Sequence, residues 1–234
     1  MIGRPRVHYR VTGSTNERAR ELALGGAPHG MLVTADEQTS GRGRQGRAWT
    51  APPRSAVLMS LVLRELHELL PLAAAVGVCD ACECEGSLPQ QAKIKWPNDI
   101  WVKKRKIAGI LIEGRPQDGW AVLGIGLNVD MVEEDFPPEL RGTATSLQIE
   151  WGAPPIDQMV VALVRAMADW LAATPDEILA AWRKRDALKG ERVSWADGEG
   201  EATGIDDSGA LLVETDSGRV TLDAGEVHLG FAPP

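Results

Sequence analysis

The chain has 234 residues, 44% of them hydrophobic and 25% charged, which is enough for one large domain or for one large domain with a small satellite. Its formal net charge is −8 at pH 7, so the molecule as a whole repels nucleic acids and anionic membranes. A site for a polyanion must therefore be a local basic patch.

No run of apolar residues approaches the roughly 18 residues of a membrane span, and the N-terminal segment holds no apolar signal core. We therefore expect a cytoplasmic protein. The three cysteines, Cys79, Cys82 and Cys84, are odd in number and lie in one segment, which favours reduced thiols. Cys79 and Cys82 share helical spacing with apolar neighbours, so cysteines buried in a helix are favoured over a metal site.

The segment from Ser14 to Glu17 resembles a capping box, because a serine is followed three residues later by a glutamate. Apolar residues then recur at helical spacing until Gly25 and Gly26 end the predicted helix. The sequence alone favours a capping role for Ser14. The hydroxyl groups of Ser14 and Thr15 could equally donate to a polar ligand at the helix N-terminus.

A loop between two predicted strands, 31–35 and 57–63, carries the most concentrated chemistry of the chain. From Gly41 to Trp49 it interleaves three glycines with three arginines, Arg42, Arg44 and Arg47. Glycines let backbone amides approach a ligand closely, and guanidinium groups donate in pairs to carboxylate and phosphate oxygens. The spacing matches neither a P-loop nor the GxGxxG order of dinucleotide folds. The loop predicts an anion site, with a solvated basic loop or a nonspecific nucleic-acid contact as alternatives.

The middle of the chain predicts one helix and several strands. Residues 71–84 form one apolar helical face, with Pro71 in the first turn. Extended runs are expected at 93–96, 100–102, 107–113 and 120–129, with a basic hairpin turn at 103–106. Gly109, Gly124 and Gly126 lie inside two of these apolar runs, where glycine often marks a close approach of ligand or backbone. They indicate the floor of a cleft, and ordinary bulges are the alternative.

The C-terminal part predicts two helices and then a small β domain. Apolar residues at helical spacing span 157–173, and Thr174, Pro175 and Glu177 form a capping box for the next helix. After Gly190 short alternating strands are separated by Gly/Asp/Ser turns, at 192–195, 201–205, 210–214 and 219–222. We expect a separate small β-barrel there.

Two motifs carry a family resemblance. The loop GRGRQGRAW at 41–49 and the run KWPND at 95–99, followed by KIAGILIE at 106–113, closely resemble those of the biotin protein ligases. The likeness extends from Ser14 to the terminal strands, so it covers nearly the whole chain. It implies an α+β fold with a mixed β-sheet flanked by helices in residues 1–187, related to class II aminoacyl-tRNA synthetases and lipoate ligases. An SH3-like domain is implied in residues 188–234.

The resemblance also implies a two-step reaction. Biotin and MgATP would give biotinyl-5′-AMP and pyrophosphate, and a lysine of a biotin carboxyl carrier domain of a biotin-dependent carboxylase would then attack the mixed anhydride. ATP and Mg²⁺ are the implied cofactors, biotin is the substrate, and Mg²⁺ would be held mainly through ATP, with no protein ligands assigned. A homodimer is compatible with the family.

The implied catalytic residues are Lys106, Arg44, Asp99 and Lys95. A biotin carboxylate must attack an anionic α-phosphate, so positioned cations are needed to reduce the repulsion. By resemblance, Lys106 would bridge the carboxylate and the α-phosphate, and Arg44 would lie near both. Asp99 could orient or deprotonate the acceptor lysine, with metal binding or structural pairing as alternatives.

The remaining implied contacts divide between the two ligands. Those expected at biotin are Ser14, Thr15, Asn16, Gln38, Gly41, Arg42, Gly43, Lys106, Gly109, Gly124 and Gly126. Those expected at ATP are Arg42, Arg44, Arg47, Trp49, Asn128 and Lys106. Hydroxyl and amide side chains suit the ureido ring of biotin, whose donors and acceptors need partners in a buried pocket. Trp49 could stack on adenine, or it could be a core residue.

One departure from many bacterial relatives is the short segment before Ser14, which holds too few residues for a helix-turn-helix domain. We expect a monofunctional ligase that binds neither specific DNA sequences nor membranes. A lipoate or octanoate ligase is the nearest alternative, against which the arginine loop and KWPND argue. A non-catalytic nucleotide-binding module is the second alternative, against which Lys106, Asp99 and Arg44 argue.

Overall fold

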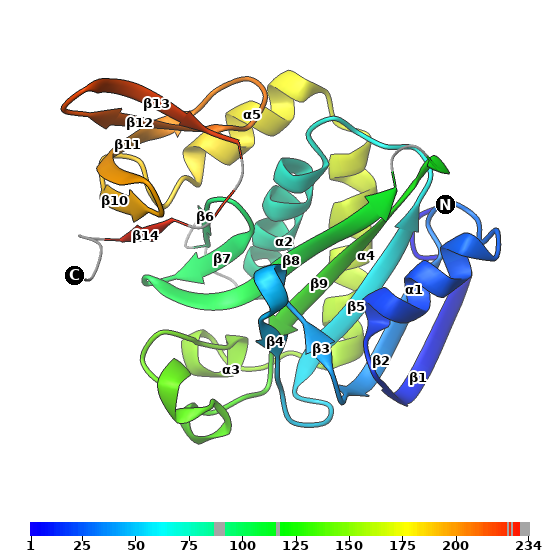
Figure 1. Ribbon diagram of the computed structural model, residues 1–234. Helices are drawn as coiled ribbons and strands as arrows, with labels where there is room; N and C mark the ends of the chain where they lie inside the picture. The colour runs from blue at the N-terminus through cyan, green and yellow to red at the C-terminus, as the bar shows by residue number, and fades with distance from the viewer. Residues whose placement is uncertain (87–91, 116–117, 224, 226, 230–234) are drawn as a thin grey trace.

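A seven-stranded mixed β-sheet organises the larger part of the molecule, in the order β1-β2-β5-β9-β8-β7-β6 (Figure 1). The computed structural model describes residues 1–86, 92–115, 118–223, 225 and 227–229. The strands of this sheet are β1 (Arg6–Thr12), β2 (Leu32–Gln38), β5 (Ala56–Leu63), β6 (Lys93–Lys95), β7 (Asp99–Val102), β8 (Arg105–Arg115) and β9 (Trp120–Asn128). β1 pairs with β2 in parallel, and the other neighbours are antiparallel. The expected mixed sheet is confirmed.

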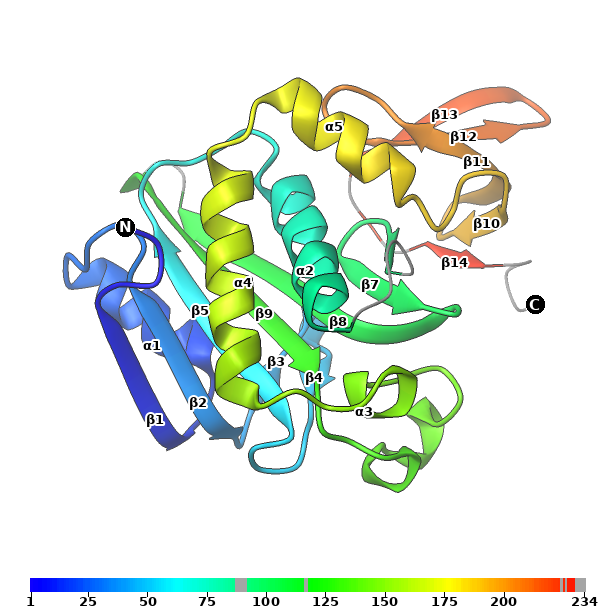
Figure 2. The same ribbon diagram turned by 180° about the vertical axis from the view of Figure 1, so that it is seen from behind.

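Helices cover both faces of the sheet. α2 (Leu70–Gly86) and α4 (Ile156–Leu171) pack side by side on one face, as Figure 2 shows, and α1 (Thr15–Leu24) lies on the other face against β5 and β9. Both of the longer helices follow the predicted apolar stripes. β5 is buried along its whole length because it lies between these two layers, which explains its uninterrupted apolar sequence.

The two predicted capping boxes have different outcomes. α5 (Pro175–Lys184) begins as expected, because the Glu177 carboxylate accepts from the Thr174 backbone N–H at 2.8 Å and the Thr174 hydroxyl accepts from the Glu177 N–H. At α1 the prediction is wrong. The Ser14 side chain makes no capping hydrogen bond, and Glu17 instead forms an ion pair with Arg42 at 3.3 Å.

The C-terminal strands form a five-stranded antiparallel sheet in the order β13-β12-β11-β10-β14. The strands are β10 (Arg192–Trp195), β11 (Gly198–Ile205), β12 (Leu211–Thr215), β13 (Gly218–Leu222) and β14 (His228–Leu229). The arrangement is consistent with a small SH3-like domain. Pairings among the described residues leave β13 and β14 at the two edges, so they show an open sheet where a barrel was expected.

One hydrophobic core joins both sheets. Leu72 of α2 and Leu211 of β12 belong to the same buried cluster, and the Trp96 indole donates a hydrogen bond to the Gly209 carbonyl at 3.0 Å. Figure 1 shows the C-terminal sheet beside the β6–β7 end of the larger sheet. Of the described helices, none is both long enough and apolar enough to cross a membrane.

Shorter elements complete the described chain. They are β3 (Gly41–Arg42), η1 (Arg44–Gly46), β4 (Ala48–Trp49), η3 (Glu133–Asp135), η4 (Pro138–Leu140) and α3 (Leu147–Glu150). The first three make up the arginine-rich loop, and the last three follow β9. Figure 1 shows the first group in front of β8 and β9 and the second group beyond the C-terminal end of β9.

Candidate functional site

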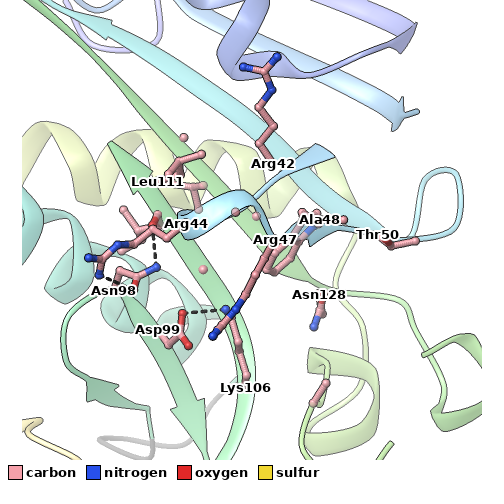
Figure 3. Close-up of a pocket in the computed structure, with 18 of the residues that line it drawn as sticks. Arg42, Arg44, Arg47, Ala48, Thr50, Asn98, Asp99, Lys106, Leu111 and Asn128 are labelled. Atoms are coloured by element: carbon pink, nitrogen blue, oxygen red, sulfur yellow. Dashed lines mark hydrogen bonds and ion pairs between the residues drawn. The ribbon is translucent and has the colours of Figure 1, made fainter. Parts of the chain in front are cut away.

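A cavity of about 340 Å³ lies between the arginine-rich loop and the sheet face formed by β5, β8 and β9 (Figure 3). Nearly all of the predicted site residues line it: Ser14, Thr15, Asn16, Gln38, Arg42, Gly43, Arg44, Arg47, Trp49, Lys95, Asp99, Lys106, Gly109, Gly124, Gly126 and Asn128. Gly41 is the exception. It pairs with Trp49 in the β3–β4 hairpin and lines a neighbouring hollow instead.

The arginine-rich loop is a short β-hairpin rather than an irregular segment. β3 pairs with β4, and the Gly43 N–H donates to the Arg47 carbonyl at 2.7 Å. The turn places Gln45 and Gly46 in the left-handed region, with φ of 54° and 76°. Glycine adopts that conformation without a steric penalty, which accounts for one glycine of the motif. The hairpin holds its arginines over the sheet.

Arg44 reaches across the cavity to the KWPND segment. Its guanidinium Nη1 donates to the Asn98 side-chain oxygen at 3.2 Å, and the Asn98 amide in turn donates to the Ile110 carbonyl at 2.9 Å. Figure 3 shows these side chains pointing toward one another. Asn98 was not predicted as a site residue, although the KWPND motif contains it. It fixes Arg44 against β8.

Lys106 and Asp99 form the central ion pair of the cavity. The Lys106 Nζ lies 2.7 Å from an Asp99 carboxylate oxygen and 5.8 Å from the centroid of the Trp49 ring. About a third of the Lys106 side chain and a sixth of the Asp99 side chain are exposed, so both groups can reach a ligand. Asp99 is thus paired within the protein. Structural pairing was one of the three roles that the sequence left open, beside acting on the acceptor lysine and binding a metal.

A bulge in the β7–β8 pairing directs Lys106 into the cavity. Trp101 pairs with Lys106, whereas Ile100 pairs with Ala108, so Ile107 is the extra residue on β8. Ile107 and Ala108 are both buried in the core. Because side chains on a regular strand alternate between faces, the extra residue is what allows Lys106 and Gly109 to line the same cavity.

At the α1 end of the cavity, hydroxyl and amide groups form a network. The Thr15 backbone N–H and hydroxyl both donate to the Gln38 side-chain oxygen, at 2.7 and 3.0 Å. The Asn16 amide donates to the Glu113 carboxylate at 2.7 Å, and its oxygen accepts from the Ser60 hydroxyl at 2.6 Å. Neither Ser60 nor Glu113 was predicted as a site residue, although Glu113 ends the KIAGILIE motif. The protein itself thus orients Asn16.

Gly109, Gly124 and Gly126 form the floor of the cavity, and their lack of a side chain makes room for the Trp49 and Asn16 side chains. A Cβ on Gly126 would lie 2.5 Å from the Trp49 ring, and one on Gly109 would lie 3.1 Å from it. A Cβ on Gly124 would collide with the Asn16 side-chain oxygen. The β8–β9 ladder runs through these positions without a register shift, so the bulge alternative is wrong and the cleft-floor interpretation is confirmed.

Trp49 is half-buried and lines the cavity, so the core alternative for this residue is wrong. Its indole Nε1 is buried and has no hydrogen-bond partner in the described structure. The ring lies against the glycine floor, with Lys106 over it. It is therefore placed to present an aromatic surface to a ligand.

The cavity is strongly positive although the protein is acidic. The described lining residues include five cations, Arg42, Arg44, Arg47, Lys95 and Lys106, and one carboxylate, Asp99. Local cations against a net charge of −8 make this face suited to anions. Within the described part of the chain, no group of three or more His, Cys, Asp or Glu side chains is arranged to hold a metal ion.

The segment after β9 closes one side of the cavity with mostly apolar residues. Phe136, Leu140, Thr143 and Ala144 line it there, and Asn128 at the end of β9 donates its amide to the Thr145 carbonyl at 2.9 Å. Gly225 and Val227 of the C-terminal region also line the cavity. Asn128 was predicted at ATP, whereas the site role of Phe136, Leu140, Thr143, Gly225 and Val227 was not predicted, because only the folded chain brings them to the cavity.

Two family sequence models match this chain. Residues 8–130 match the biotin/lipoate A/B protein ligase family, and residues 190–230 match the biotin protein ligase C terminal domain. The bifunctional ligase/repressor BirA of Bacillus spizizenii is 35% identical over 98% of this chain and 75% of its own. The biotin--[acetyl-CoA-carboxylase] ligase of Paracoccus denitrificans is 35% identical over 94% of this chain and 98% of its own.

The fold has a close match among solved structures. The biotin protein ligase from Aquifex aeolicus in complex with biotin and ATP superimposes with a TM-score of 0.84 and 26% identity, covering 98% of this chain and 100% of that one. Sequence and structure therefore agree from the first strand to the C-terminal sheet. The chain belongs to the biotin protein ligases, within the biotin/lipoate A/B protein ligase family.

Proposed function

We propose that the protein is an ATP-dependent biotin protein ligase, which forms biotinyl-5′-AMP and transfers the biotinyl group to a lysine of a biotin carboxyl carrier domain. The observation that carries this proposal is the convergence of Arg44, Arg47 and Lys106 on one cavity in an acidic protein. The names of the matched relatives and the biotin and ATP of the Aquifex aeolicus complex support it.

In the first step, a carboxylate oxygen of biotin attacks the α-phosphorus of ATP, the bond between the α-phosphorus and the bridging oxygen breaks, and pyrophosphate leaves. Attacking group and phosphates are all anionic, so cations that are already in place lower the barrier. Lys106 and Arg44 are held by Asp99 and Asn98, which limits how far they must move. We assign them to the carboxylate and the α-phosphate.

In the second step, the acceptor lysine must lose its proton before its nitrogen attacks the carbonyl carbon of the anhydride. The carbon–oxygen bond to AMP then breaks, and AMP leaves with the electron pair. Asp99 is the carboxylate among the described lining residues, so we assign it to orienting the amine and receiving its proton. Its ion pair with Lys106 would be rearranged when the phosphates draw Lys106 away.

The remaining residues of the cavity divide into contacts for biotin and contacts for the adenine of ATP. We assign Ser14, Thr15 and Gln38 to the ureido ring of biotin, and Trp49 and Asn128 to adenine. Mg²⁺ would neutralise phosphate charge when bound. Because the described lining residues offer one carboxylate, already paired with Lys106, the ion would be held mainly by the ATP phosphates.

Release of pyrophosphate on mixing the protein with biotin and MgATP tests this proposal. We expect release that depends on biotin and stops after about one turnover without a carrier domain, because the adenylate stays bound. Lipoate in place of biotin should give little release. Release with lipoate alone would make the protein a lipoate ligase, and binding of ATP without release from either acid would favour a non-catalytic module.

A further inference from the structure

Glu150, at the end of α3, is a buried carboxylate with three cationic or hydroxyl partners. Only 1% of its side chain is exposed. The Thr145 hydroxyl donates to it at 2.7 Å, the Lys103 ammonium lies 2.9 Å away, and the Arg105 guanidinium donates to the same oxygen as Thr145. A carboxylate is buried at this depth only when such partners satisfy it.

The partners of Glu150 lie immediately around Lys106 in the fold. Arg105 precedes it on β8. On its other side, the Lys106 N–H donates to the Thr143 carbonyl and the Thr145 N–H donates to the Lys106 carbonyl, each at 2.8 Å. The backbone of Lys106 is thus held between two residues of the segment that Glu150 anchors.

Thr145 also connects this anchor to Asn128. Its carbonyl accepts from the Asn128 amide at 2.9 Å, and both residues are almost completely buried. A single carboxylate therefore reaches the backbone of Lys106 and the side chain of Asn128 through one intermediate residue. Two residues on different strands, both lining the cavity, share one point of support.

Lys106 needs such support because the bulge at Ile107 breaks the regular β7–β8 ladder beside it. A bulge leaves its extra residue unpaired and gives the strand local freedom to twist. On the edge of β8 away from β7, hydrogen bonds with the Thr143 carbonyl and the Thr145 N–H hold the Lys106 backbone.

We propose that Glu150 is a positioning residue. Through Thr145 and Arg105 it fixes the positions of the Lys106 ammonium group and the Asn128 amide group in the cavity. The kinetic consequence rests on the proposed ligase function. Glu150 does not line the cavity, so its loss should displace Lys106 and Asn128 without removing either. A displacement of about 1 Å at a reacting group lowers turnover by up to about 100-fold.

The kinetic test compares two disruptive variants with two matched controls. Glu150→Gln keeps the shape and removes the charge, and Thr145→Val removes only the hydroxyl. Thr145→Ser keeps that hydroxyl. Glu83→Gln removes a carboxylate that is 10% exposed and paired with Arg185, outside the cavity. Each variant is assayed for biotin-dependent pyrophosphate release in the presence of saturating carrier domain, so that the enzyme turns over, after circular dichroism has shown that it is folded.

We expect kcat to fall about 10-fold to 100-fold in Glu150→Gln and Thr145→Val, with the KM for ATP raised and the KM for biotin within about twofold of wild type. Thr145→Ser and Glu83→Gln should keep the wild-type kcat. A folded Glu150→Gln variant with wild-type kcat and KM for ATP would overturn the proposal. An equal loss of kcat in Glu83→Gln would also overturn it, because the loss would then result from lower stability and not from displacement of Lys106 and Asn128.

A second measurement does not depend on turnover. Lysine amines are labelled with ¹³C-methyl groups, and the Lys106 resonance is identified by its absence in Lys106→Arg. We expect this resonance to shift in Glu150→Gln and Thr145→Val and to stay in place in the two controls. An unshifted resonance in Glu150→Gln overturns the positioning role. If the wild type releases no pyrophosphate, the ligase proposal fails, and the resonance still decides whether Glu150 positions Lys106.

Discussion

At the scale of single residues, the site depends on positions where a side chain is missing. Gly126 and Gly109 lie directly beneath the Trp49 indole, and Lys106 lies over that ring. The ring therefore rests on these glycines, with the Lys106 ammonium group close to Gly109 as well. This arrangement joins a stacking surface for a ligand to the cation that the proposed first step requires.

Gly126→Ala should displace Trp49, because the new Cβ would lie 2.5 Å from its ring. We expect kcat/KM for ATP to fall about 10-fold or more and stability to fall by about 1–3 kcal/mol through overpacking. The control is Gly25→Ala, where the new Cβ would meet backbone oxygens at 3.4 Å or more. Steady-state kinetics with both variants checks this. Wild-type kinetics in Gly126→Ala would mean that the position of Trp49 does not matter.

Residue patterns in the sequence predicted many of the site residues but not the residues that hold them in place. The arginine loop, KWPND and Lys106 were predictable because several reactive residue types stand close together in the sequence. Asn98, Ser60 and Glu113 escaped notice, since each acts on a residue that is distant in the chain. Ser14 was misassigned as a cap because the local pattern could not show that Glu17 pairs with Arg42.

At the scale of elements, sequence reasoning located the buried strands and the amphipathic helices, because their periodicity follows from burial on one or both faces. β1 was missed. It is an exposed edge strand with charged residues, and its parallel pairing with β2 spans the whole of α1. The β3–β4 hairpin was read as a loop, since two-residue strands leave no periodic signal. Both misses reflect contacts that only the folded chain brings together.

The junction of β8 and α3 should make stability depend on pH. Burial tends to raise the pKa of Glu150, but hydrogen bonds from Lys103 and Thr145 and the nearby charge of Arg105 outweigh it and lower the pKa below its ordinary value of 4.5. A carboxyl group with a lowered pKa contributes stability above its unfolded pKa and loses it as pH falls through the folded value.

We therefore expect Glu150→Gln to reduce stability near neutral pH and to flatten the loss of stability below about pH 4.5, the ordinary pKa of this group. Urea unfolding at several pH values, followed by circular dichroism, measures both effects. Parallel pH profiles for wild type and variant would contradict this account of the junction.

At the scale of the whole molecule, both sheets share one core and both contribute to the cavity. Buried residues of α2, β8 and the C-terminal strands belong to one cluster, and Gly225 and Val227 line the cavity beside residues of the large sheet. The C-terminal sheet is thus packed as part of the same structure. This arrangement predicts cooperative unfolding of the two sheets.

Two buried thiols in α2 report on that cooperativity. Burial raises the pKa of Cys82 to about 12 and that of Cys79 well above its ordinary value, so both stay protonated at pH 8. In a Cys84→Ser variant, we expect negligible alkylation by iodoacetamide in native buffer. Labelling in urea should follow the same transition as circular dichroism. Rapid labelling of either thiol in native buffer would show that α2 opens independently.

The central claim is that this cavity joins biotin to a protein lysine by means of Lys106. The most direct test is transfer of biotin to a purified biotin carboxyl carrier domain in the presence of MgATP, with wild type and Lys106→Ala compared after both are shown to be folded. The account predicts transfer by the wild type and a loss of about 100-fold or more in the variant. No transfer by the folded wild type to a competent carrier, or equal transfer by Lys106→Ala, would contradict it.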